Sequence, residues 1–200
     1  MRAEKVPFKV ILMTAAIETR LRLAAIGITE EEILYAKESG NGGFCNVFKT
    51  KGVKIAALAV KAPIDDEVQD IFDRDLNPTF FNGTLAEATA SHPNLTRLNG
   101  IVPYVVFTNN ARIPRTCLVE EFVNHEYTLK EAIEGNLIDD TTKVRLILEL
   151  ISAVSHLHEH NILHKDIKPA NVLLIKGNDG QWHAKLTDYN ISKEIGSPII

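Results

Sequence analysis

The chain has 200 residues, of which 45% are hydrophobic and 24% are charged. These fractions are typical of a globular protein and exclude disordered, collagen-like and low-complexity classes. The formal net charge is -4 and no run of basic residues offers a track for phosphates, so we expect no nucleic-acid partner. Cys45 and Cys117 are too few for a disulfide framework and lack the paired spacing of a zinc site, which favours an intracellular, cytoplasmic protein.

The longest apolar run near the N-terminus covers residues 10–17, far short of the roughly 20 residues that span a bilayer. Charged residues follow this run, in place of the small residues of a signal-peptide cleavage site. We therefore expect no membrane partner and no secretion signal. Residues 8–27 are interpreted as an amphipathic helix that ends near Gly27.

The first half of the chain has the pattern of antiparallel strands. Apolar stretches between residues 33 and 61 are separated by a glycine-rich turn at 40–43 and by a second turn at 51–52. Further along, the pattern predicts a helix from about Thr84 to before Pro93 and strands at 101–107 and 116–123.

After Asn136 the pattern becomes helical. Apolar residues at spacings of three and four predict a helix over 142–158, and because they cover much of its girth we expect this helix to be buried. Loop and short strands are predicted over 162–175, then a turn at 177–180 and a strand at 184–186. The fold class is therefore α+β, with a strand-rich half joined to a helix-rich half near residues 121–128.

The glycine-rich turn suggests a site for an anionic ligand. Glycines let backbone amides approach a ligand closely, although a plain hairpin turn is the alternative reading of this segment. The residues after the turn form a strand, which excludes a Rossmann fingerprint, and no Gly-Lys-Ser/Thr follows, which excludes a P-loop. Lys61 ends a later apolar strand, where its ammonium could reach phosphates held under the turn or could simply be solvated.

A second group of polar residues lies near the C-terminus. Residues 162–174 place several polar side chains between apolar flanks, which a purely structural loop has little reason to do. Asp188 follows the predicted strand at 184–186. His156 and His160 share a helical face at a spacing found in some zinc sites, but no third ligand is evident, so we interpret them as helix-end packing.

The order of these motifs resembles that of the eukaryotic protein kinases over roughly residues 33–200. The matching segments are 40–47 for the glycine-rich loop, 59–61 for the lysine strand, 118–123 for the hinge, 164–171 for the catalytic loop and 188–190 for the Asp-Phe-Gly triplet. The resemblance implies a two-lobed α+β fold with an antiparallel, strand-rich N-lobe and a partial helical C-lobe. We expect an N-terminal helical extension at 1–32, the nucleotide-binding N-lobe at 33–123 and the partial C-lobe at 124–200.

The resemblance implies ATP and Mg²⁺ as cofactors and the serine or threonine hydroxyl of a protein as substrate. Asp166 would act as the base and Lys168 would neutralise the γ-phosphate, while Asn171 and Asp188 would bind the metal. Lysine at position 168 resembles the serine/threonine-specific subgroup. The nucleotide-binding residues that it implies are Gly40, Gly42, Gly43, Val47, Lys61, Glu121 and Val123, with Glu120 at the gatekeeper position.

In the family that this sequence resembles, a carboxylate on a helix forms an ion pair with the lysine of the lysine strand. Glu87 is our choice for the partner of Lys61, although it lies about one turn closer to Pro93 than the family pattern suggests. The alternatives are Asp73, Asp75 and Glu67, or no partner among these acids, which would then be solvated surface charge.

Some residues depart from the family pattern. Cys45 occupies the third glycine position of the glycine-rich loop. Tyr189 replaces the phenylalanine of the triplet and adds a hydroxyl that needs a partner when buried. Asn190 replaces its glycine, and asparagine enters the left-handed backbone region more readily than most residues. Lys165 stands where many members carry arginine, which makes regulation through a phosphorylated activation loop less expected.

The chain ends twelve residues after Asp188, within what would be the activation segment. We interpret it as a truncated kinase domain whose helix at 142–158 lacks its usual cover, so a partner could occupy that face. The leading function is an ATP-dependent serine/threonine protein kinase. The alternatives are a pseudokinase or nucleotide-binding interaction module without transfer activity and, less favoured, a small-molecule kinase.

Overall fold

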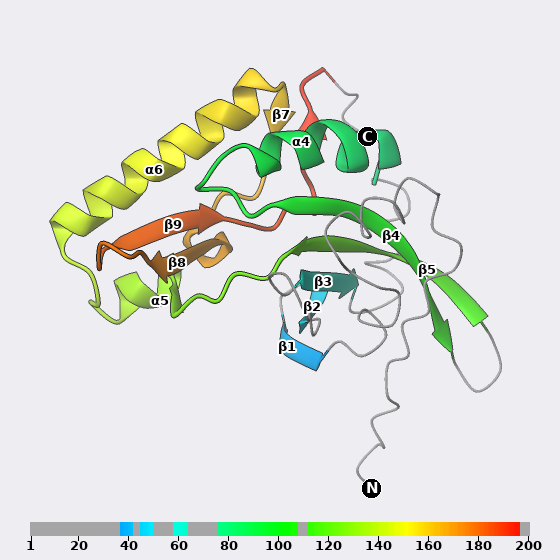
Figure 1. Ribbon diagram of the computed structural model, residues 1–200, viewed down its shortest axis with the longest axis horizontal. Helices are drawn as coiled ribbons and strands as arrows, with labels where there is room; N and C mark the ends of the chain where they lie inside the picture. The colour runs from blue at the N-terminus through cyan, green and yellow to red at the C-terminus, as the bar shows by residue number, and fades with distance from the viewer. Residues whose placement is uncertain (1–36, 42–44, 50–57, 64–75, 108–111, 197–200) are drawn as a thin grey trace, which may run out of the picture. The chain divides into compact units, whose positions relative to one another are not determined.

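The computed structural model describes residues 37–41, 45–49, 58–63, 76–107 and 112–196, which form two compact units (Figure 1). The first unit takes its described residues from positions 37–63 and 99–122, and the second from positions 76–98 and 123–196. The predicted extension at 1–32 and its helix at 8–27 lie outside the described residues.

The first unit is built on a five-stranded sheet whose strand order is β1-β2-β3-β5-β4. The pairs β1–β2, β2–β3 and β3–β5 are antiparallel, as the alternating turns of the sequence predict. The strands are β1 (Lys37–Asn41), β2 (Cys45–Lys49), β3 (Leu58–Pro63), β4 (Leu98–Phe107) and β5 (Arg112–Glu121).

The register of this sheet places several predicted nucleotide-binding residues on neighbouring strands. Lys61 on β3 lies opposite Val47 on β2 and opposite Leu118 on β5. Gly40 on β1 lies opposite Val47 on the other side, next to a bulge in β1. The strands β1 and β2, on either side of the glycine-rich turn, therefore belong to the same sheet as the lysine strand β3.

The second unit begins with a helix that starts earlier than the sequence predicts. A π-helical turn, Phe80–Thr84, leads into α4 (Leu85–Ala90). Asn77 starts the helical segment, since its side-chain oxygen accepts a hydrogen bond from the amide of Thr79 at 2.9 Å. After α4 the hydroxyl of Ser91 donates to the carbonyl of Ala88, and the helix ends before the proline as expected.

Two capped helices follow β5 along the chain. The short helix α5 (Leu129–Glu134) starts with a capping box, in which Thr128 and Glu131 satisfy each other's backbone amides. The long helix α6 (Asp140–Glu159) starts at Asp139, whose carboxylate accepts from the amide of Thr142 at 2.7 Å. Of the helices in the described part of the chain, none combines the length and the apolar character needed to cross a bilayer.

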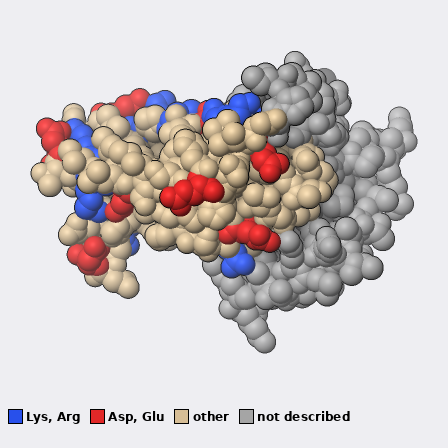
Figure 2. All heavy atoms as spheres, turned by 90° about the horizontal axis from the view of Figure 1, so that it is seen from above, with Lys and Arg blue, Asp and Glu red and all other residues tan. Residues whose placement is uncertain are grey.

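The expectation that α6 is buried is wrong for part of the helix, whereas the expectation that it has a face without its usual cover agrees with the described structure. Leu146, Ala153 and Leu157 are fully buried where α6 packs on β9 and α4. The neighbouring apolar stripe is more than half exposed, and it consists of Val144, Ile147, Leu148 and Ile151. Figure 2 looks down on the side where α6 lies in Figure 1 and shows broad uncharged areas between isolated charged groups.

The rest of the second unit is made of short strands. β6 (Tyr127–Thr128), β8 (Val172–Lys176) and β9 (Trp182–Leu186) form a three-stranded sheet in the order β6-β8-β9. β7 (Ile162–Leu163) pairs with β10 (Lys193–Glu194). These elements agree with the loop, turn and strands predicted after residue 162.

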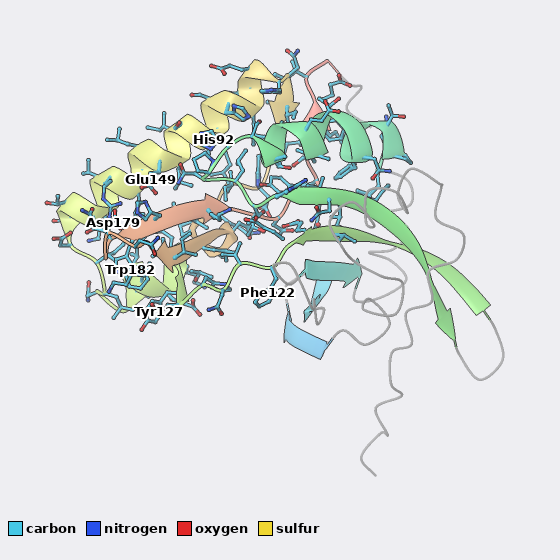
Figure 3. The ribbon with its side chains drawn as sticks, viewed as in Figure 1. His92, Phe122, Tyr127, Glu149, Asp179 and Trp182 are labelled. Atoms are coloured by element: carbon cyan, nitrogen blue, oxygen red, sulfur yellow. The ribbon has the colours of Figure 1, made fainter. Side chains whose placement is uncertain are left out.

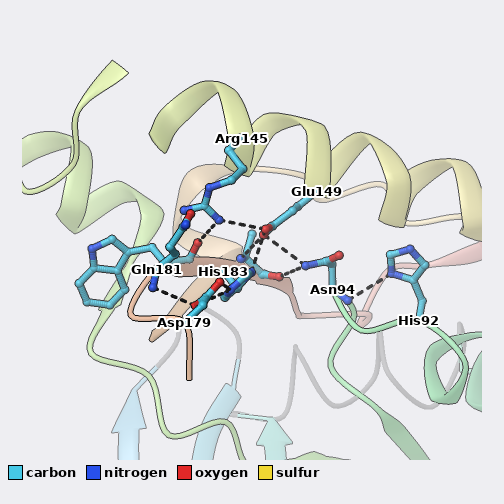
Figure 4. Close-up of polar contacts among 9 residues, drawn as sticks. His92, Asn94, Arg145, Glu149, Asp179, Gln181 and His183 are labelled. Atoms are coloured by element: carbon cyan, nitrogen blue, oxygen red, sulfur yellow. Dashed lines mark hydrogen bonds and ion pairs between the residues drawn. The ribbon is translucent and has the colours of Figure 1, made fainter. Parts of the chain in front are cut away.

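Glu149 of α6 holds the helix against β9 and the segment before β4 (Figures 3 and 4). Its carboxylate accepts from the amide of Ala184 at 2.7 Å and from the side chain of Asn94 at 3.3 Å. It also pairs with Arg145 at 3.2 Å and with His183 at 2.9 Å. One partly buried carboxylate thus satisfies four donors from three segments.

We expect Glu149→Gln to lower the free energy of unfolding by about 1–3 kcal/mol, because an amide has one accepting oxygen and turns its NH₂ toward other donors. Urea unfolding measures the change. The matched control is Glu134→Gln, which removes a solvent-exposed ion pair with Lys130 and should change the free energy by less than about 0.5 kcal/mol. Equal effects of the two substitutions would contradict this role of Glu149.

His92 joins α4 to α6 as a neutral side chain. Its Nδ1 accepts from the amide of Asn94 at 3.2 Å, and its Nε2 lies 3.1 Å from the hydroxyl of Ser152. Its ring is 5.0 Å from that of His156. Burial, and secondarily the positive charge that His156 can carry, lower the pKa of His92 below 6.5.

Because the pKa of His92 is lower in the folded chain, the unfolded chain binds this proton more readily. The stability that the neutral side chain contributes is therefore present above pH 6.5 and is lost as the pH falls through the folded pKa. We expect the free energy of unfolding to drop less between pH 7.5 and 5.5 in His92→Asn, which keeps an acceptor for Asn94 but does not titrate. His158→Asn, at an exposed position, is the control, and identical pH profiles for His92→Asn and wild type would refute the assignment.

Candidate active site

The hairpin of β8 and β9 brings the predicted catalytic loop to the predicted metal-binding triplet. Val172 pairs with Leu186 at the open end of the hairpin, so the residues just outside this pair are neighbours. The amide of Thr187 donates to the carbonyl of Asn171 at 2.9 Å. Asn171 and Asp188 are therefore close in space although they are 17 positions apart in the sequence.

Asp166 receives two hydrogen bonds from the same loop. Lys168 Nζ donates to Asp166 Oδ2 at 2.7 Å, and Asn171 Nδ2 donates to the same oxygen at 2.8 Å. Asn171 Nδ2 also donates to the backbone carbonyl of Asp166 at 2.9 Å. The 3-10 turn Pro169–Asn171 folds the loop back on itself, which brings these three side chains together.

These contacts favour the charged form of Asp166. Partial burial works to raise its pKa, but the hydrogen bonds from Lys168 and Asn171 and the charge of Lys168 outweigh burial. The pKa of Asp166 therefore lies below its ordinary value of 3.8. At neutral pH the side chain is a carboxylate that can accept a proton.

His164 connects the loop to the segment before Asp188. Its Nδ1 accepts from the amide of Asp166 at 3.3 Å, so its Nε2 carries the proton and donates to the carbonyl of Thr187 at 3.1 Å. The carbonyl of His164 accepts from the hydroxyl of Ser192 at 3.2 Å. His164 is buried, so these bonds are shielded from water.

The backbone at two site residues adopts the left-handed conformation. Asp188 has φ 75° and Lys165 has φ 68°; this conformation costs an ordinary L residue such as lysine about 1–2 kcal/mol and aspartate less. Asn190, which replaces the glycine of the family triplet, does not belong to the described residues with positive φ. The left-handed conformation that asparagine tolerates is therefore not needed at position 190.

The hydroxyl of Tyr189 has hydrogen-bond partners, as a buried hydroxyl needs. The side chain is fully buried, and its hydroxyl donates to the carbonyl of Thr96 at 2.8 Å and lies 3.1 Å from the carbonyl of Leu186. Its ring lies 5.3 Å from that of His164. Thr96 is a site residue that the motifs did not reveal, since it stands as an ordinary threonine between Leu95 and Arg97 and belongs to none of the motifs.

The donor set fits Mg²⁺, an ion that prefers hard oxygen ligands. Asn171 uses its amide nitrogen on Asp166, which leaves its amide oxygen as the atom available to a cation. Asp188 supplies a carboxylate next to it in the fold. The described residues contain no group of three or more His, Cys, Asp or Glu side chains that could hold a metal, so His156 and His160 form none with a third ligand there.

The remaining predicted residues belong to other parts of the chain. Gly40, Val47, Lys61 and Glu121 lie in the first unit, and Gly42 and Gly43 lie outside the described residues. Val123 opens the second unit, and its carbonyl accepts from Nδ1 of His125 at 3.1 Å. The convergence of the first-unit residues with Asp166 and Asp188 stays a prediction.

Glu87, our choice for the partner of Lys61, is exposed on α4 in the second unit. The alternatives Asp73, Asp75 and Glu67 lie outside the described residues. The pairing of Lys61 with any of these carboxylates therefore also stays a prediction.

We expect Lys168→Met to raise the pKa of Asp166, because it removes both the shortest hydrogen bond to the carboxylate and the nearest positive charge. The pKa is measured from the pH dependence of the side-chain carboxyl ¹³C chemical shift in the free protein. Lys165→Met, in the same loop, is the control and should leave the titration unchanged. An unaltered Asp166 titration in Lys168→Met would contradict the geometry described above.

Comparisons with known proteins agree with the motifs and the fold. The family model described as "Protein kinase domain" matches residues 35–199. The putative L-type lectin-domain containing receptor kinase V.1 of Arabidopsis thaliana is 30% identical over 181 residues, which cover 86% of this chain and 23% of that protein. The probable serine/threonine-protein kinase PknB of Lactococcus lactis is 28% identical over 162 residues, which cover 80% of this chain and 23% of that protein.

A third relative is the serine/threonine-protein kinase DCLK3 of Mus musculus, which is 26% identical over 165 residues that cover 80% of this chain and 19% of that protein. The chain thus spans about a fifth of the length of these curated relatives. The family model covers most of the chain, and the catalytic-loop and triplet motifs lie together in the second unit. The chain therefore belongs to the protein kinase family, of the eukaryotic type.

Proposed function

We propose that this chain transfers the γ-phosphate of ATP to a serine or threonine hydroxyl of a protein substrate. The observation that carries the proposal is the position of Asp166, a carboxylate that accepts hydrogen bonds from Lys168 and Asn171 beside the segment that carries Asp188. Phosphoryl transfer needs a general base and oxygen ligands for a cation, and these residues can supply both.

In the proposed reaction Asp166 accepts the proton of the substrate hydroxyl while that oxygen attacks the γ-phosphorus. The bond from the γ-phosphorus to the bridging oxygen breaks, and ADP leaves with the electron pair. Lys168 lies 2.7 Å from Asp166, so its ammonium is close enough to the base to compensate charge on the transferred phosphoryl group.

Asn171 and Asp188 would hold Mg²⁺, which supplies neutralisation of phosphate charge when it is bound. The chain's contribution is to fix these two ligands. Asn171 is oriented by its two hydrogen bonds to Asp166, and the Asp188 segment is held by the bond from Thr187 to Asn171.

Residues of the first unit, together with Val123 of the second unit, would bind the nucleotide. Lys61 would contact the α- and β-phosphates, with backbone amides of the glycine-rich turn over them. Backbone groups of Glu121 and Val123 would meet the adenine. The antiparallel register supports this part of the proposal, because Val47 lies opposite Lys61 on one side and opposite Gly40 on the other.

The acceptor is proposed to be serine or threonine because Lys168 stands two positions after the base, and because two of the relatives are named serine/threonine-protein kinases. The runner-up is a chain that binds nucleotide without transferring phosphate. Its signature is nucleotide-induced stabilisation without incorporation of phosphate.

We expect Asp166→Asn and Lys61→Met to abolish measurable transfer to a generic basic protein with Mg²⁺ and ATP, because base and phosphate-binding residues each contribute about 10²-fold or more. Incorporation of ³²P measures the rate. Asp140→Asn and Lys130→Met change the same residue types at exposed positions and should transfer at the wild-type rate. Wild-type-like turnover by either site variant would overturn the assignment of roles.

If wild type itself incorporates no phosphate but is stabilised by nucleotide, the runner-up replaces the proposal. Thermal unfolding with and without Mg²⁺ and ADP, run on the same samples, distinguishes that outcome from a chain that binds no nucleotide.

A further inference from the structure

The hydroxyl of Tyr189 is the centre of a small buried hydrogen-bond cluster. It is 2.8 Å from the carbonyl of Thr96 and 3.1 Å from that of Leu186, and it accepts from the hydroxyl of Thr96 at 3.3 Å. A phenol has one hydrogen, so the shorter distance identifies the carbonyl of Thr96 as its main acceptor. Both residues are buried, which shields the cluster from water.

The backbone around Thr96 is itself fixed to the end of β9. The amide of Thr96 donates to the carbonyl of Leu186 at 2.9 Å, and the amide of Leu186 donates to the carbonyl of Asn94 at 2.8 Å. These two bonds enclose a parallel bridge between Leu95 and Leu186. The hydroxyl of Tyr189 therefore anchors to a rigid part of the second unit.

Asp188 lies between two fixed neighbours. Thr187 donates its amide to Asn171 and accepts from His164 through its carbonyl. Tyr189 is held on the other side by the cluster with Thr96. Asp188 between them has φ 75°, a left-handed conformation that is uncommon for residues other than glycine, although aspartate adopts it more readily than most.

We propose that Thr96 and the Tyr189 hydroxyl are positioning residues, whose hydrogen-bonded pair holds Asp188 in the left-handed conformation from which it binds Mg²⁺. The metal in this statement rests on the proposed function. The pair acts through Asp188 and touches no reacting atom.

Two substitutions separate the hydroxyl from the packing of the ring. Tyr189→Phe keeps the ring beside His164 and removes the hydroxyl, so it removes the bonds to Thr96 and Leu186 together. Thr96→Val keeps the carbonyl that accepts from Tyr189 and removes the longer bond, from the hydroxyl of Thr96 to that of Tyr189. We therefore expect a smaller effect from Thr96→Val, wild-type behaviour from Thr96→Ser, and a double variant no worse than Tyr189→Phe alone.

Two Mg²⁺ concentrations are measured. The first gives half-maximal phosphate transfer from ATP, and the second gives half-maximal thermal stabilisation in the presence of ADP. Loss of one hydrogen bond corresponds to about a 2- to 12-fold change in an equilibrium constant, so Tyr189→Phe should raise both concentrations by about that factor. Tyr127→Phe, which changes a half-buried tyrosine of β6, is the matched control and should leave both unchanged. All assays are run well below the melting temperature of each variant.

A lower melting temperature of Tyr189→Phe with an unchanged Mg²⁺ requirement would overturn the proposal, because a purely structural role predicts that result. A second readout needs neither nucleotide nor activity. Hydrogen exchange of the Thr187 amide in the free protein should be about 2- to 12-fold faster in Tyr189→Phe than in wild type, and an equal rate would also overturn the proposal. If wild type shows no response to Mg²⁺ and nucleotide while this exchange rate rises, the proposed function fails and the positioning of Asp188 stands.

Discussion

The register of the β8–β9 hairpin is the constraint on which the candidate site depends. Because Val172 pairs with Leu186, the backbone of Asn171 meets that of Thr187, and the base and the metal ligands converge. Asn171 has two tasks in this arrangement, since its amide nitrogen orients Asp166 while its oxygen remains for a cation. A shift of the hairpin by one residue would turn alternate side chains to the opposite face and separate the whole group.

Electrostatics and backbone strain work together at this site. Lys168 and Asn171 stabilise the charged form of Asp166 and fix the position of its carboxylate. Asp188 is held in a disfavoured conformation by contacts on both sides. Strained residues of this kind persist where the surroundings determine them, and they concentrate at functional sites. In this chain Tyr189 adds a hydrogen bond that phenylalanine, the residue of the family triplet, has no hydroxyl to make.

Sequence patterns predicted the positions of helices and strands better than they predicted which faces of these elements are buried. The strands at 101–107 and 116–123 correspond to β4 and β5, and the helix at 142–158 corresponds to α6, because periodicity reports secondary structure directly. The same periodicity does not report what covers an apolar face, so the burial of α6 was predicted wrongly. The catalytic-loop residues could be predicted from their motif. Thr96 could not, because its role arises from a contact with a residue 93 positions away.

The central claim is that Lys61 from the first unit and Asp166 and Asp188 from the second act on one nucleotide. A crystal structure of the chain with Mg²⁺ and a non-hydrolysable ATP analogue tests it most directly. We expect the ammonium of Lys61 on the α- and β-phosphates and the ion coordinated by oxygens of Asn171 and Asp188. A nucleotide bound away from Lys61, or phosphates that lie far from Asp166, would contradict the account.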